Sequence, residues 1–110
     1  MANTFKLKTK ANVGVTTVGI YTAPAATTTV VIGITMSNTS GSGVNVGVGI
    51  TRAGTTEDVK LLKNAPIPQG SSLEFMGGNK VVLETTDTLT VDSDTNNSVD
   101  AALTLSLIDI

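Results

Sequence analysis

The sequence predicts an all-β protein, an antiparallel β-sandwich that is jelly-roll-like and has eight or nine short strands. Of the 110 residues, 19 are Thr and 13 are Val, and β-branched residues fit a pleated sheet better than a helix. Runs of alternating apolar and polar residues recur, with turn residues every ~8–12 positions, which is typical of sandwiches and barrels. Apolar residues nowhere repeat with the 3.6-residue period of a helix.

The first half of the chain predicts three strands. Residues 13–21 are β-branched and apolar. Pro24 is expected to end this strand, because proline has no N–H to donate to a sheet. Residues 44–51 alternate Val or Ile with Asn, Gly and Thr, a clear period-2 pattern, and residues 52–58 are expected to be a loop. Between these two strands lies the strand 28–37, whose apolar face is expected to hold Val30, Ile32, Ile34 and Met36.

Residues 38–43 are small or polar and include two glycines, which predicts a turn. With this turn in the middle, residues 28–52 are expected to form one hairpin. In its second strand, Gly47 and Gly49 lie on the face opposite the valines. Because glycine has no side chain, this face has room for another backbone or sheet to approach closely.

The second half of the chain predicts further short strands, at residues 58–64, 71–76, 80–84, 88–92 and 98–108. Four turns or loops separate these strands. They are a turn with two prolines at residues 65–70, a Gly-Gly-Asn turn at 77–79, a Thr-Thr-Asp turn at 85–87 and a polar loop at 92–97. The length allows one domain. We expect residues 12–110 to form a single sandwich and residues 1–11 to be an N-terminal arm or edge strand.

Charge is divided unevenly along the chain. Residues 1–56 carry four cations and no acid, whereas residues 57–110 carry nine acids and three lysines. This is either composition drift that disappears once the strands interleave, or a basic arm that docks on an acidic surface. Lys6, Lys8 and Lys10 alternate with uncharged residues, so their ammonium groups point the same way in an extended chain. Such a row fits a protected edge strand as well as an electrostatic arm.

The composition excludes many kinds of site. The chain has no His, Cys or Trp, so the usual ligands of zinc, haem and iron–sulfur clusters, the Ser-His-Asp triad and disulfides are missing. We therefore predict a protein that is not an enzyme, with no catalytic residue, cofactor or metal. Net charge −2 and three aromatic residues disfavour nucleic acid. No apolar run is long enough for a membrane span, and we expect no secretion signal at the start of the chain.

Three sets of acidic residues are candidate sites. The loop that begins Asp92-Ser93-Asp94 starts like an EF-hand, but it lacks the glycine and the final glutamate of that motif. An ordinary surface loop is expected, and a weak Ca²⁺ site of Asp92 and Asp94, with Asp87 as a further ligand, is the alternative. Acid/base pairs for glycoside hydrolysis have no support beyond the carboxylates themselves, and solvated loop acids are expected at Glu84 with Asp87 and at Glu57 with Asp58.

Positions predicted to face outward are mostly Thr, Ser, Asn and Gly. Such side chains cost less to desolvate than Lys or Glu, and charged groups are depleted in the cores of interfaces. Exposed strand edges can also join partners by strand addition. These features favour a subunit of an assembly over a free enzyme.

Five segments between residues 13 and 110 carry a family resemblance, and the most distinctive is Leu62–Glu74. The others are residues 20–24, Met36–Thr39, Lys80–Glu84 and Ser98–Asp100. Together they resemble the small structural proteins of tailed bacteriophage virions, of the marine and cyanobacterial phage type. Where similar proteins have Gly-Asp before a strand, this chain has Thr86-Asp87. The resemblance implies a β-sandwich that repeats many times in a phage particle.

We therefore expect a non-enzymatic virion structural protein, specifically a capsid decoration (cement) protein that binds the outer shell and stabilises capsomer contacts. The expected location is the virion, after assembly in the host cytoplasm. Expected partners are the major capsid protein or other virion proteins, and further copies of the chain in a trimer or dimer. Alternatives are a tail, neck or baseplate component and, less favoured because aromatic residues are few, a carbohydrate- or host-receptor-binding module.

The N-terminal segment Ala2–Ala11 is the expected partner-binding element. Its charged anchors would be Lys6, Lys8 and Lys10, and its apolar anchors would be Phe5 and Leu7.

Overall fold

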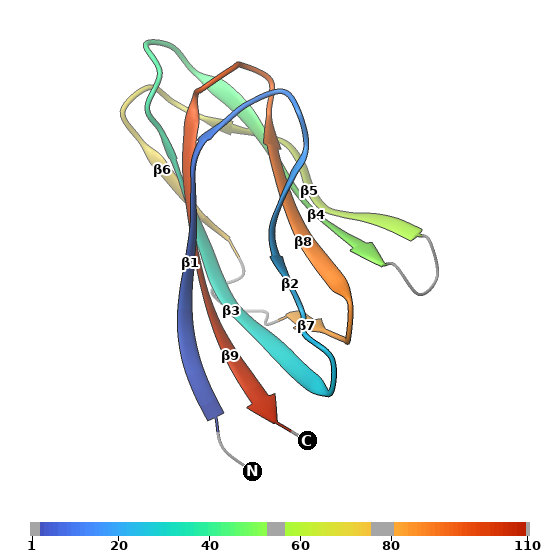
Figure 1. The fold of residues 1–110 in the computed structure, drawn as a ribbon. Coiled ribbons are helices and arrows are strands. Elements are labelled where there is room, and N and C mark those ends of the chain that lie inside the picture. The colour runs from blue at the N-terminus through green and yellow to red at the C-terminus, as the bar shows by residue number, and fades with distance from the viewer. Residues whose placement is uncertain (1–2, 53–56, 76–80, 110) are drawn as a thin grey trace.

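The computed structural model describes residues 3–52, 57–75 and 81–109, which form nine β-strands and no helix (Figure 1). The strands are β1 (Asn3–Val13), β2 (Val18–Thr22), β3 (Thr27–Asn38), β4 (Val44–Arg52), β5 (Glu57–Ile67), β6 (Ser72–Phe75), β7 (Val81–Leu83), β8 (Asp87–Ser93) and β9 (Val99–Asp109). They build two antiparallel sheets that face each other, so the predicted all-β sandwich is confirmed. Within the described residues, a helix able to cross a membrane is absent.

Sheet A has the strand order β1-β9-β3, with β6 and β7 both paired to the far side of β3. Sheet B has the order β2-β8-β4-β5. Most consecutive strands thus alternate between the two sheets, as in a jelly roll. The exceptions are β4 and β5, both in sheet B, and β6 and β7, both in sheet A. The fourth strand of sheet A is divided: β6 pairs with Ile34–Ser37 and β7 with Thr29–Val31. β1 begins and β9 ends at the same end of the sandwich.

The predicted hairpin of residues 28–52 is wrong. β3 lies in sheet A and β4 in sheet B, so the connection between them crosses from one sheet to the other. Asn38 holds this connection, because its side-chain amide donates hydrogen bonds to the carbonyl oxygens of Ser42 and Ile67, at 2.8 and 2.9 Å. Both strands bury one apolar face in the same core. Their apolar and polar residues therefore alternate in the same way whether the connection crosses between sheets or forms a hairpin.

The predicted apolar face of β3 is also partly wrong. The register of β3 with β9 shifts between Val31 and Gly33, and a bulge of this kind inserts a residue and reverses the alternation. Val30 and Ile32, expected inside, are therefore only half-buried. The apolar residues that β3 places in the core are Val31, Ile34 and Met36.

Several element boundaries differ from the expected ones. The strand expected at 13–21 begins at Val18. β5 continues through Pro66 to Ile67, which is tolerated because β5 is an edge strand and needs no outward N–H. The turn then follows, with Gly70 at a φ of 74°. The turn expected at 77–79, Met76 and the strand start at Lys80 lie outside the described residues.

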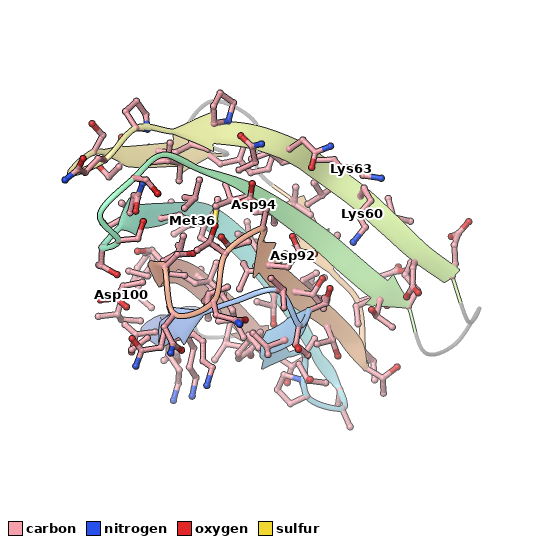
Figure 2. All side chains as sticks on the ribbon, turned by 90° about the horizontal axis from the view of Figure 1, so that it is seen from above. Met36, Lys60, Lys63, Asp92, Asp94 and Asp100 are labelled. Atoms are coloured by element: carbon pink, nitrogen blue, oxygen red, sulfur yellow. The ribbon has the colours of Figure 1, made fainter. Side chains whose placement is uncertain are left out.

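The core lies between the two sheets, and the labelled Met36 marks its place (Figure 2). Burying a Val or Leu side chain contributes about 1.5–3 kcal/mol. Among the described residues, all buried side-chain nitrogen and oxygen atoms have a hydrogen-bond partner. Alternate residues of β4, β8 and β9 supply ten of the core's buried apolar side chains, namely Val44, Val46, Val48, Ile50, Leu89, Val91, Val99, Ala101, Leu103 and Leu105.

Candidate interaction surface

Strand β1 forms one edge of sheet A, and its lysines lie on one face of it. The eight residues from Asn3 to Lys10 pair with β9 without a register shift. Opposite residues in a ladder share a face, and the partners of Lys6, Lys8 and Lys10 are the core residues Leu105, Leu103 and Ala101. The lysine row therefore lies on the core-side face of β1. All three side chains are exposed, so sheet B does not cover this part of the strand.

Phe5 and Leu7 lie on the opposite, outer face of sheet A. They are 71% and 65% exposed. Phe5 pairs with Ser106 of β9, Ser106 pairs with Val30 of β3, and Val30 pairs with Val82 of β7. These four residues form a row across the sheet, and Val82 at its far end is 53% exposed. Leu7 pairs with Thr104 and lies beside this row, on the same face of β1 as Phe5. We call the apolar members Phe5, Val30 and Val82, together with Leu7, the apolar row.

The five residues expected to bind a partner are thus separated by the strand itself. Phe5 and Leu7 face outward from sheet A, whereas the lysine row faces the other way. A partner with one flat surface cannot contact both groups at once. Only a partner that reaches the open edge of β1 meets the lysines and the apolar side chains together.

Sequence reasoning missed Val30 and Val82 as surface residues. The uninterrupted alternation of residues 28–37 predicts a core position for Val30, and the bulge after Val31 is what turns it outward. Val82 belongs to a strand of three residues, which is too short to show a face. The row could have been found only by knowing which distant strands pair, because its members come from β1, β3 and β7.

The outer face of sheet B is polar, and its glycine positions are filled from within the same sheet. A Cβ at Gly47 would lie 2.6 Å from Asp92 Oδ1, and one at Gly49 would lie 2.8 Å from the carbonyl oxygen of Val59. The expected close approach of another backbone is confirmed at Gly49, but the neighbour is β5 of the same sheet and not another sheet. The two glycines allow Asp92 and the β5 backbone to lie close to β4.

The acidic loop at the end of β8 is held by protein groups. Asp92 Oδ2 accepts a hydrogen bond from Thr17 Oγ1 at 3.0 Å and lies 3.8 Å from Lys60 Nζ, and Asp94 Oδ1 accepts one from the Asn45 N–H at 3.1 Å. Figure 2 shows these acids beside β4 and β5. The described part of the chain contains no group of three or more acids placed to hold a metal.

Asp87, the further ligand considered for calcium, lies at the other end of β8 and pairs with Arg52. Its Oδ1 accepts a hydrogen bond from Arg52 Nε at 3.2 Å, and its Oδ2 accepts one from the Glu84 N–H at 3.0 Å. Arg52 also pairs with the Glu84 carboxylate. The hydrogen bonds that Arg52 donates to Asp87 and Glu84 raise its pKa, and the one to Asp87 has the larger effect.

This corner joins β4 of sheet B to the turn between β7 and β8, and it lines a surface hollow of about 340 Å³. The two carboxylates considered as an acid/base pair, Glu84 and Asp87, are thus engaged by one guanidinium. Glu57 and Asp58 are exposed neighbours on β5, so they point to opposite faces of the strand. The corner is a connection between the sheets.

Comparison with known proteins shows the fold. No family model matches the chain, and no curated protein matches it. A chain from the capsid of Helicobacter pylori bacteriophage KHP30 matches with a TM-score of 0.58 and 9% identity, over 97% of this chain and 87% of that one. A chain from the disulfide-linked pili of Bacillus endospores matches with a TM-score of 0.55 and 13% identity, over 96% and 84%.

Infectious bursal disease virus (Gx strain) provides a third match, with a TM-score of 0.58 and 15% identity, over 98% of this chain but 32% of that one. At these identities the likeness establishes a shared jelly-roll fold. The expected resemblance to virion structural proteins is supported at that level.

Proposed function

We propose that this chain is a non-enzymatic structural subunit of a virion, and that it decorates the outside of a capsid shell. The observation that supports this best is the apolar row, because Phe5, Leu7 and Val82 are largely exposed to water. The buried polar side-chain atoms of the described residues, in contrast, all have hydrogen-bond partners. Solved structures that share the fold of this chain come from a phage capsid, a viral particle and a pilus. Each of these is an assembly of many protein copies.

Attachment through the apolar row would be driven by burial of apolar area. Burying apolar surface contributes about 25 cal/mol per Å², and exposed apolar patches on soluble domains commonly mark interaction sites. The affinity of one such contact is modest. Copies that also bind each other in a dimer or trimer around a symmetry axis attach through several contacts at once, which raises the overall affinity for the shell. The proposed partners are the major capsid protein or another virion protein.

The test is binding of the purified chain to phage particles that lack it, measured by co-sedimentation. Replacing two residues of the apolar row together, Phe5→Ser with Leu7→Ser, is expected to weaken binding by about tenfold or more. The matched control is Val15→Ser, because Val15 is 56% exposed but lies in the loop after β1. Equal binding by the double variant and the wild-type chain would contradict the proposal.

The same assay measures the number of bound copies. Saturation at many copies per particle supports decoration, whereas saturation at a small fixed number would overturn it in favour of a neck, tail or baseplate role. Deleting residues 2–11 is a less suitable test, because β1 pairs with β9 from Asn3 to Lys10. Its removal would expose the ladder of a core strand.

A further inference from the structure

The open edge of β1 is the most regular strand edge in the described part of the molecule. Among the described strands, β1 pairs only with β9, and their ladder runs from Asn3 to Lys10 without a shift. At the other edge of sheet A the strand is divided between β6 and β7. In sheet B, β2 has five residues and a register shift, while β5 has two shifts and contains Pro66.

A regular edge strand presents a row of N–H and C=O groups to which another strand can bind. Pairing of two copies through β1 is disfavoured, because the two lysine rows would face each other and like charges opposite one another are destabilising. A strand with acidic residues at alternate positions has no such penalty. Its acids would lie opposite Lys6, Lys8 and Lys10.

We propose that the open edge of β1 binds an extended segment of a partner protein by strand addition, and that this segment alternates acidic with apolar residues. The acidic side chains would lie beside the lysine row, and the apolar ones beside Phe5 and Leu7 on the outer face of sheet A. The bound strand thereby contacts both groups that a flat partner cannot reach together. This inference rests on the proposed function and specifies how the shell partner attaches.

The probe is a short synthetic peptide in which Glu and Val alternate, with binding measured by fluorescence anisotropy. One control peptide has the same composition with Glu and Val in separate blocks, which removes the two-sided pattern. A second is N-methylated along one edge, which removes hydrogen-bond donors and keeps every charge. The alternating peptide is expected to bind, and both controls are expected to bind at least about tenfold more weakly.

Charge variants of the protein test the contribution of the lysine row. Lys8→Glu is expected to lower the affinity for the alternating peptide by about fivefold to tenfold. The matched control, Lys63→Glu, makes the same change in net charge on an exposed residue of β5 and is expected to have less than about a twofold effect. Thermal unfolding is measured for both, and Lys8→Gln serves as a second variant with an expected loss of about threefold.

Equal binding of the blocked or N-methylated peptide would overturn strand addition, and so would equal effects of Lys8→Glu and Lys63→Glu. The two proposals can fail separately. If the alternating peptide does not bind while the Phe5 and Leu7 double variant still loses shell binding, decoration holds and strand addition is wrong. If the peptide binds but the chain does not bind particles, strand addition holds and the decoration role is wrong.

Discussion

The outer face of sheet B uses its own side chains to satisfy its polar groups, whereas the outer face of sheet A leaves apolar side chains in water. On sheet B, Thr22 and Thr88 share a hydrogen bond of 2.9 Å between their hydroxyl oxygens, and Asp92 binds Thr17 and Lys60. On sheet A, the apolar row ends at exposed Phe5 and Val82. Both faces belong to sheets that bury the same core.

The difference indicates where association can be favourable. A polar group that already has a partner loses hydration when another protein covers it and gains little in return. An exposed apolar side chain has no hydrogen bond to lose and gains free energy on burial. Residues of the sheet B face should therefore matter mainly for folding, and residues of the sheet A face mainly for binding.

The largest expected effect on stability is on the sheet B face, at Gly49→Ala. The new Cβ would lie 2.8 Å from the Val59 carbonyl oxygen, which is backbone and cannot move without shifting β5. We expect a loss of roughly 1–3 kcal/mol in the free energy of unfolding, or a fall of roughly 5–15 °C in Tm. Gly41→Ala is the control, since a Cβ there meets nothing within 4 Å. Equal stabilities would show that the sheet B face is not closely packed.

A smaller effect is expected at the corner that links the two sheets. Asp87→Ala removes the acceptor for Arg52 Nε and for the Glu84 N–H, and a part-buried hydrogen bond of this kind contributes about 0.5–1.5 kcal/mol net. Asp58→Ala changes the charge equally at an exposed position of β5 and should change stability by less than about 0.5 kcal/mol. Urea denaturation of both variants measures the difference. If they lose the same amount, the corner does not hold the sheets together.

Thr86→Gly should raise stability. Thr86 has a φ of 71° in the turn before β8, a conformation that is unfavourable for a β-branched residue and easy for glycine. Relief of this strain, reduced by the greater freedom of glycine in the unfolded chain, leaves a gain of about 0.5–1 kcal/mol. Thr85→Gly, the neighbouring exposed position, should lose stability instead. A loss in both variants would mean that Thr86 is not strained.

The smallest effect on stability is expected on the sheet A face. Leu7→Ser removes a side chain that is 65% exposed, so the free energy of unfolding should change by no more than about 0.5 kcal/mol. Thermal unfolding tests this directly. A loss as large as that of Gly49→Ala would show that Leu7 serves folding, and the contrast between the two faces would disappear.

The sequence predicts the class of fold because its signal is local. Val44, Val46, Val48 and Ile50 alternate without interruption, and β4 is found where this pattern places it. The lysines of β1 share one face for the same reason, since alternation within one strand determines it. Neither result needs knowledge of which strands pair.

Features that depend on pairing could not be predicted. The crossing between β3 and β4 has the same local alternation as a hairpin, and the bulge at Ile32 leaves no mark in the composition of β3. Arg52 and Asp87 are far apart in the sequence and meet only because β4 pairs with β8. The apolar row likewise exists only through the pairing of four strands.

The most direct test of the contrast between the faces is a cryo-electron microscopy map of the particle that contains this chain. We expect many copies on the outside of the shell, each with Phe5, Val30 and Val82 of sheet A buried against a neighbour and the outer face of sheet B in solvent. Copies that bind through the face of Gly47 and Gly49, with the apolar row left in solvent, would contradict it.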